Sequence, residues 1–258
     1  GWEPTGRAGL VLDAGQVRLR AAAYLGWRLP TLNELYRPFR VGADATAANA
    51  ALRPETMRGA ETGFDWEPAE GLLLRATLFE NRLTDAIANV TLGAGPGVFP
   101  GVGFVAAGGA YRQRLNVGAV RSRGVELDAA WRSGDWSLTA SYALADARIR
   151  SGGAAAALDG LRPAQVPRHL ASATIGWRGL SATLRHVSAQ FEDDGNTRRL
   201  AAATTLDAVA RIPLSSAVSV VARAENLGNA RVEAAISGTG VIERAAPRTL
   251  WIGISYRD

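Results

Sequence analysis

Apolar and polar residues alternate with a period of two along most of the chain. In residues 135–146 the apolar positions are Trp136, Leu138, Ala140, Tyr142 and Leu144, with Ser, Thr and Ala between them. Successive side chains of a strand point to opposite faces, so this pattern indicates strands with one apolar face; helical spacing fits none of these windows. The pattern predicts eleven strands, the first being the weakest, over residues 7–13, 17–27, 56–66, 72–81, 124–131, 135–146, 169–177, 180–187, 203–213, 218–225 and 248–256.

The connections between these strands are alternately short and long. Tight turns rich in Gly, Pro, Asp and Ser occupy residues 13–16, 67–70, 132–135, 178–179 and 213–216. Long polar or Gly-rich stretches occupy about 31–55, 92–111, 149–165, 190–202 and 228–245. A soluble sandwich has no reason for this rhythm, whereas outer-membrane barrels have short periplasmic turns and long extracellular loops. The sequence therefore predicts an all-β fold of about 11–12 antiparallel transmembrane β-barrel strands.

Aromatic residues mark one end of the apolar faces. Trp66, Trp131, Trp136, Trp177 and Tyr256 each lie within a residue or two of a short turn or of the C-terminus. Barrels carry girdles of aromatic side chains at the membrane interfaces, so we interpret these five as the periplasmic girdle. Trp27 does not fit, because it lies at the long-loop end of its strand.

Eleven is an odd number of strands, and it leaves the first and last strands parallel with unpaired edges. Bacterial single-chain barrels have even strand numbers and closed edges. We therefore expect either one uncounted strand or a wall that belongs to a larger barrel. The chain begins with Gly1 and shows no signal-peptide pattern, which favours the larger barrel.

Composition excludes several other classes of protein. The chain has 258 residues, of which 47% are hydrophobic and 21% charged, so it is neither disordered nor collagen-like. It has no Cys, which excludes disulfide scaffolds, zinc ribbons and thiolate catalysis. The 29 basic residues are all Arg and are spread along the chain, which argues against a nucleic-acid-binding arm. The mean hydropathy of −0.01 suits a barrel, in which only every second residue faces lipid.

The sequence offers little for an enzyme. His169 and His186 are isolated, no Gly-x-Ser-x-Gly turn occurs, and the Gly-rich residues 93–109 lack the Lys of a phosphate-binding loop. The acidic run 192–194, together with Asn196, is either a weak Ca²⁺ site or a solvated loop, and we favour the loop. We therefore predict no enzyme activity, no cofactor and no structural metal.

Several short motifs appear in a fixed order from about residue 24 to the end. They are Arg28-Leu-Pro-Thr-Leu-Asn-Glu-Leu-Tyr36, Asn49 with Leu52-Arg-Pro-Glu55, Gly59-x-Glu61, Phe79-x-Asn81 with Asp85-x-Ile87, Arg123-Gly-Val-Glu126, Pro167-Arg-His169, Glu225-Asn-Leu227 and Pro247-Arg-Thr249. In this order they resemble the barrel of the TonB-dependent outer-membrane receptors. Each motif alone is weak, but together they are specific.

The resemblance implies a 22-stranded barrel in the cell outer membrane with an N-terminal plug inside it. Residues 1–258 would be the C-terminal portion of that barrel, and the sequence shows no plug domain, signal peptide or TonB box. The implied partners are outer-membrane lipid, the plug and remaining strands, and, through the missing N-terminal part, the TonB energy-coupling protein. The implied cargo is a ferric siderophore or a similar large chelate, which is moved without any bond being made or broken.

Substrate contacts are expected in the long loops and the upper lumen. Arginines interleaved with aromatic residues suit anionic, aromatic siderophores, since guanidinium groups and rings both bind such ligands. The candidate substrate-binding residues are Tyr36, Arg37, Arg40, Tyr111, Arg112, Arg114, Arg198 and Arg199, with Phe39 and Gln113 beside them.

A second hypothesis is a self-standing barrel of about twelve strands. Such a barrel would act as a passive pore or as the translocator of a surface protein, and this chain length would be adequate for it. It requires one more strand that pairs the two edges.

Overall fold

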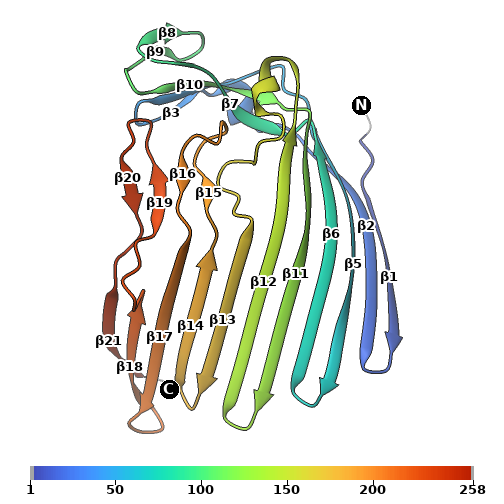
Figure 1. The fold of residues 1–258 in the computed structure, drawn as a ribbon, viewed down its shortest axis with the longest axis vertical. Coiled ribbons are helices and arrows are strands. Elements are labelled where there is room, and N and C mark those ends of the chain that lie inside the picture. Colours follow the sequence, from blue (N-terminus) through green and yellow to red (C-terminus); the bar gives the residue numbers. More distant parts are fainter. Residues whose placement is uncertain (1–2, 257–258) are drawn as a thin grey trace.

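The computed structural model describes residues 3–256. Its main feature is an antiparallel sheet of eleven strands in the order β1-β2-β5-β6-β11-β12-β13-β14-β17-β18-β21, drawn as a curved wall in Figure 1. The bounds are β1 Gly6–Ala14, β2 Val17–Arg28, β5 Glu55–Ala69, β6 Leu72–Thr84, β11 Ala119–Ser133, β12 Trp136–Arg150, β13 His169–Trp177, β14 Leu180–Val187, β17 Ala203–Pro213, β18 Val218–Glu225 and β21 Thr249–Tyr256. All eleven predicted strands are present, and four of them have the predicted bounds.

Consecutive wall strands are neighbours in space, joined by short turns at one end and by five long loops at the other (Figure 1). We call the loops A (29–54), B (85–118), C (151–168), D (188–202) and E (226–248). Within the described residues, β1 and β21 pair with one neighbour each and not with each other, so the sheet is an open wall.

The two faces of the wall differ as the alternation predicts. In the register of β11 with β12, Val125 lies opposite Leu144 and Leu127 opposite Tyr142 on the outward face. On the inward face, Asp65 accepts a hydrogen bond from Arg20 at 3.1 Å, and Arg185 forms an ion pair with Asp207. The outward face suits lipid and the inward face suits a wet lumen.

The loops contain short elements that the sequence did not predict. These are α1 Leu32–Tyr36, β3 Phe39–Val41, β4 Asp44–Ala47, β7 Ile87–Ala94, β8 Gly97–Phe99, β9 Gly103–Val105, β10 Ala110–Asn116, the 3₁₀ helix η1 Gly153–Leu158, β15 Gln190–Phe191, β16 Arg199–Leu200, β19 Glu233–Ile236 and β20 Ile242–Arg244. Loops A and B share one sheet of order β3-β4-β10-β7, in which β4 and β10 are parallel.

Buried apolar residues lie in and beneath the loops rather than in the wall. One cluster joins loops B and C with the end of β12 and contains Val90, Val117, Ile149 and Leu158, each at most 5% exposed. A second cluster joins loops A and B around Ala45, Val105 and Tyr111. The loops are therefore a packed cap with its own hydrophobic core, while the wall exposes both of its faces.

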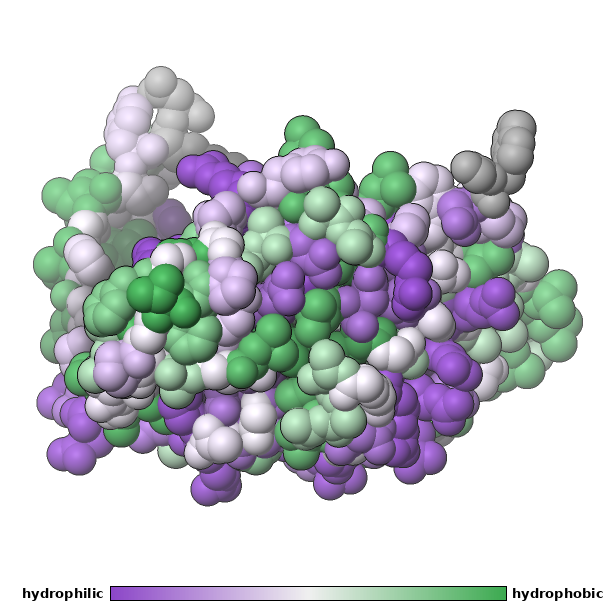
Figure 2. Space-filling view, turned by 90° about the horizontal axis from the view of Figure 1, so that it is seen from above, coloured by the Kyte–Doolittle hydropathy of each residue, from purple (hydrophilic) through white to green (hydrophobic). Residues whose placement is uncertain are grey.

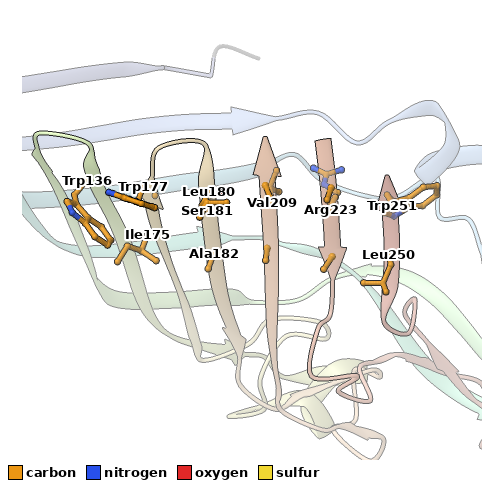
Figure 3. A pocket seen from close by; sticks show the side chains of 15 residues that line it. Trp136, Ile175, Trp177, Leu180, Ser181, Ala182, Val209, Arg223, Leu250 and Trp251 are labelled. Carbon is orange, nitrogen blue, oxygen red and sulfur yellow. The ribbon is translucent and has the colours of Figure 1, made fainter. Parts of the chain in front are cut away.

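The turn end of the outward face carries aromatic residues, as predicted. Trp136 and Trp177 lie in register, with ring centroids 5.8 Å apart, and the guanidinium of Arg178 lies 5.3 Å from the ring of Trp177. Beside them, a shallow apolar groove of about 620 Å³ has Ala182, Ala208 and other small residues in its lining (Figure 3). No helix in the described residues is long and apolar enough to cross a membrane.

Candidate functional site

All five loops contribute to one cavity of about 820 Å³ at the loop end of the wall. Viewed from that end, strongly hydrophilic residues occupy part of the surface among paler and apolar ones (Figure 2). The lining combines loop segments with the inward-facing ends of wall strands, among them Leu83, Val120 and Ile149. This loop cavity has a larger volume than the apolar groove on the outward face, and its size suits a drug-sized or larger ligand.

A polar clamp fixes the base of loop A. The guanidinium of Arg28 donates to Glu34 at 2.8 Å and to Glu55 at 2.5 Å, and Glu55 also accepts the backbone N–H of Ile87 at 2.7 Å. Thr31 begins α1 with a capping box that includes Glu34. The hydrogen bond from Arg28 lowers the pKa of Glu34 to about 2. The first motif of the sequence therefore anchors this loop to the wall and to loop B.

Arg112 and Asp44 form an ion pair across the shared loop sheet. The two side chains lie 2.9 Å apart and are 17% and 15% exposed. Asp44 also accepts the backbone N–H of Ala110 at 2.8 Å. Both line the loop cavity, where they join loop A to loop B.

The acidic run in loop D organises that loop instead of standing in solvent. Asp193 is 8% exposed and accepts the backbone N–H groups of Thr197 and Arg198. Burial acts to raise its pKa, but the hydrogen bonds from Thr197 and Arg198 outweigh burial and lower it. Asp194 accepts the backbone N–H of Thr91 at 2.7 Å and its hydroxyl at 2.9 Å, which ties loop D to loop B. The solvated-loop interpretation is wrong for Asp193, which is buried.

Carboxylates outnumber guanidinium groups around the loop cavity. Two arginines line it, Arg112 and Arg198, whereas the carboxylates are Asp44, Glu55, Glu192, Asp193, Asp194 and Glu243. Most of these carboxylates already accept hydrogen bonds from the loops. Within the described residues, no group of His, Asp and Glu is arranged to hold a metal ion.

The structure separates the eight candidate substrate-binding residues. Only Arg112 and Arg198 line the loop cavity, and Arg198 donates to the carbonyl of Ile236 in loop E at 3.2 Å. Tyr36 is 66% exposed at the end of α1, and Arg199 is exposed on β16.

The remaining four candidates make contacts within the loops. Arg40 donates to the carbonyls of Val102 and Phe104, and Arg114 donates to that of Arg37 and lies 4.9 Å from the ring of Phe39. Tyr111 is 7% exposed and stacks on Phe99, with centroids 4.6 Å apart. Arg37 ends α1. These contacts give the loops their shape.

Sequence reasoning missed the acidic part of the lining. Asp44, Glu55 and Glu243 belong to different loops or strand ends, and no spacing along the chain relates them. The one available signal was the acidic run of loop D, which sequence analysis weighed only as a metal site or a solvated loop.

The open wall, the apolar outward face and the packed loops define one class of protein, the outer-membrane type of β-barrel. The chain matches the family model described as TonB dependent receptor-like, beta-barrel, over residues 1–227, and it belongs to that family. The members of this family are receptors and transporters, not enzymes, which agrees with the sequence-based prediction. A comparison with curated proteins finds no match.

Solved structures share the fold at low sequence identity. The siderophore receptor PiuA from Acinetobacter baumannii is 17% identical with a TM-score of 0.76, and the match covers 98% of this chain and 35% of that one. The copper transporter OprC is 18% identical with a TM-score of 0.75, covering 98% and 38%. The ferric yersiniabactin uptake receptor FyuA from Yersinia pestis is 20% identical with a TM-score of 0.67, covering 97% and 36%. This chain thus spans little more than a third of their length.

Proposed function

We propose that this chain is the C-terminal part of the barrel of an outer-membrane TonB-dependent receptor, which takes up a ferric siderophore or a similar large chelate. The observation that carries the proposal is the loop cavity, to which all five loops contribute above the lumen of a barrel wall. The family membership supports a receptor, and the names of several similar structures point to metal chelates as cargo.

The open edges support a larger barrel over the self-standing one. A strand edge without a partner cannot lie in lipid, because its N–H and C=O groups have no water to bind. In our proposal, β1 and β21 pair with further strands, a plug fills the lumen, and the inward ion pairs such as Arg20–Asp65 face that plug. The energy-coupling protein TonB would act through the plug-bearing part.

The lining of the loop cavity constrains the ligand. Its excess of carboxylates favours a ligand that presents neutral or cationic polar groups to loops D and E. Arg112 and Arg198 are the two positions at which an anionic group of the ligand would be bound.

The first test is the size and location of the native protein. An antibody against residues 1–258 should detect, in outer-membrane fractions, a band far above the 27.1 kDa of this chain. A heat-modifiable band near that mass would overturn the proposal and favour the small barrel.

The second test is uptake. Deletion of the gene should abolish energy-dependent uptake of one radiolabelled metal chelate from a panel, and the intact gene should restore it. Unchanged uptake of every chelate would contradict the proposed cargo class.

A further inference from the structure

Four arginines lie side by side on the outward face of the wall, close to the loops. In the cross-strand register, Arg58 of β5 lies opposite Arg82 of β6, Arg82 opposite Arg121 of β11, and Arg121 opposite Arg148 of β12. We call these four residues the arginine row. Their face is fixed by the alternation, because Val125, Leu127 and Trp131 of β11 have the same parity as Arg121.

The height of the arginine row matches a membrane interface. On β5, Arg58 lies eight residues from Trp66, which belongs to the aromatic end of the same face. At about 3.3 Å per residue and a strand tilt of about 40°, this separation spans about 20 Å along the membrane normal, and the ten residues from Trp131 to Arg121 on β11 span about 25 Å. The apolar band of an outer-membrane barrel is about 25 Å tall. With the aromatic girdle at one interface, the arginine row therefore lies near the headgroups of the other leaflet.

The arginine row has few partners of its own, the contacts of Arg148 with Asp146 and with the carbonyl of Gly160 being the exceptions within residues 3–256. Like charges directly opposite each other on neighbouring strands are destabilising. Among residues 3–256, Arg148 alone of the four has an ion pair, with Asp146 at 3.3 Å, and the other three are exposed. Anions bound between the guanidinium groups would offset this repulsion.

Loop C adds positive charge near the β12 end of the row. The pKa of Arg162 is lowered, first by burial and then by the nearby charges of Arg148 and Arg168, while the charge of Asp146 acts in the opposite direction, so the guanidinium group of Arg162 is repelled by two others. An anion at this position would relieve that repulsion.

A hollow of about 630 Å³ lies next to the arginine row, on the side that faces the aromatic girdle. On the side of the row its lining includes Arg123 and Arg168 together with Glu80 and Asp146, and on the side of the apolar band it includes Leu78, Val125 and Leu144. Hence one continuous surface offers guanidinium groups for an anionic headgroup and, next to them, an apolar hollow for hydrocarbon.

We propose that the arginine row and the adjoining hollow bind a phosphorylated lipid of the outer leaflet, with its phosphate groups between the guanidinium groups and its acyl chains against the apolar band. Arginine binds phosphate bidentately, and clustered basic residues at a membrane surface recognise anionic lipid headgroups. Three strand spacings of about 4.8 Å make the row about 14 Å long, enough for more than one phosphate. The proposal rests on the outer-membrane location proposed above.

The test uses the native protein in detergent and purified lipid A, a glucosamine disaccharide lipid with two phosphate groups. The variant R82Q/R121Q should bind lipid A at least tenfold more weakly than the unchanged protein, as measured by native mass spectrometry or a titration of intrinsic fluorescence. The variant R82K/R121K, which keeps the charge, should lose less. The control R18Q/R178Q removes the same charge at the turn end and should change the affinity less than twofold.

Two results would overturn the proposal. One is equal loss of affinity in R82Q/R121Q and R18Q/R178Q, and the other is displacement of lipid A by an equal concentration of inorganic pyrophosphate, which would indicate a site for soluble phosphate. The heat-dependent mobility of each variant on a gel reports whether it is folded. Lipid binding in detergent does not require uptake. If the protein binds lipid A but the uptake test finds no transported chelate, only the proposed cargo is contradicted.

Discussion

The hydroxyl of Tyr24 on β2 donates a 2.7 Å hydrogen bond to the side-chain oxygen of Asn81 on β6, across the intervening strand β5. The residue of β5 between them is Gly59, which is in register with both. A Cβ atom at Gly59 would overlap the ring of Tyr24 and the side chain of Asn81. Glycine at this position is thus what allows an aromatic ring to lie flat on the lumen side of the wall.

Substitution of Gly59 should therefore destabilise the wall. G59A would force the ring of Tyr24 away and weaken its hydrogen bond, and overpacking of this kind typically costs about 1–3 kcal/mol. The temperature at which the folded protein loses its fast gel mobility should fall. G26A is the matched control, since a Cβ at Gly26 on β2 would meet nothing within 4 Å. A fall of equal size in G26A would contradict this explanation.

The clamp at the base of loop A should open in acid. The pKa of Glu34 is lowered to about 2 from its ordinary value of 4.5, so its ion pair with Arg28 stabilises the folded loop fully above pH 4.5. This stabilisation is lost as the pH falls from 4.5 to 2. Hydrogen exchange in residues 29–54, corrected for intrinsic rates, should rise over that range. E34Q should show raised exchange already at pH 7 and E70Q should not; equal exchange in both would refute the clamp.

The contact between Asp194 and Thr91 should hold loops B and D together. D194A removes both hydrogen bonds, so limited proteolysis should cut residues 85–118 and 188–202 faster than in the unchanged protein. E243Q is the control, because Glu243 of loop E lines the same cavity and, among residues 3–256, its side chain forms no hydrogen bond to either loop. Equal cleavage rates in the two variants would show that the tie does not limit loop motion.

Neighbouring arginines in loop D should differ in ligand binding. Arg198 lines the loop cavity, whereas Arg199 does not. In a binding titration with the transported chelate, R198A should weaken the affinity about tenfold, equivalent to about 1.4 kcal/mol, and R199A should have little effect. A larger effect of R199A would indicate that the ligand binds at the outer surface of loop D instead of in the loop cavity.

Period-two alternation sufficed to predict the wall. The strand over His169–Trp177 has its predicted bounds, whereas β12 runs past the predicted end at Asp146 to Arg150. The extra residues include Arg148, whose charge on the outward face interrupts the apolar pattern. The outward positions of β12 continue to alternate past Asp146. Only the cross-strand register of four strands shows that Arg148 lies in one row with three other outward arginines.

The loops could not be predicted in the same way. β4 and β10 pair in parallel, with Ala45 opposite Tyr111. The two strands are far apart in sequence, and neither shows a periodic pattern of apolar residues. The same applies to the candidate site residues. Arg40 and Arg112 look alike in sequence, but Arg40 binds backbone carbonyls and Arg112 reaches the loop cavity through its pairing with Asp44.

The parallel pairing of β4 with β10 also constrains how the cargo specificity of such a receptor changes in evolution. Loops A and B arise from different hairpins but share one sheet and one apolar cluster, so an insertion in either would disrupt the other. A lineage acquiring a new cargo would need paired changes in both loops, whereas loop E, whose strands β19 and β20 pair only with each other within residues 3–256, lies outside that sheet and is joined to loop D by hydrogen bonds such as that from Arg198 to the Ile236 carbonyl. Exchange of cargo specificity between relatives should therefore succeed with loops A and B as a single cassette.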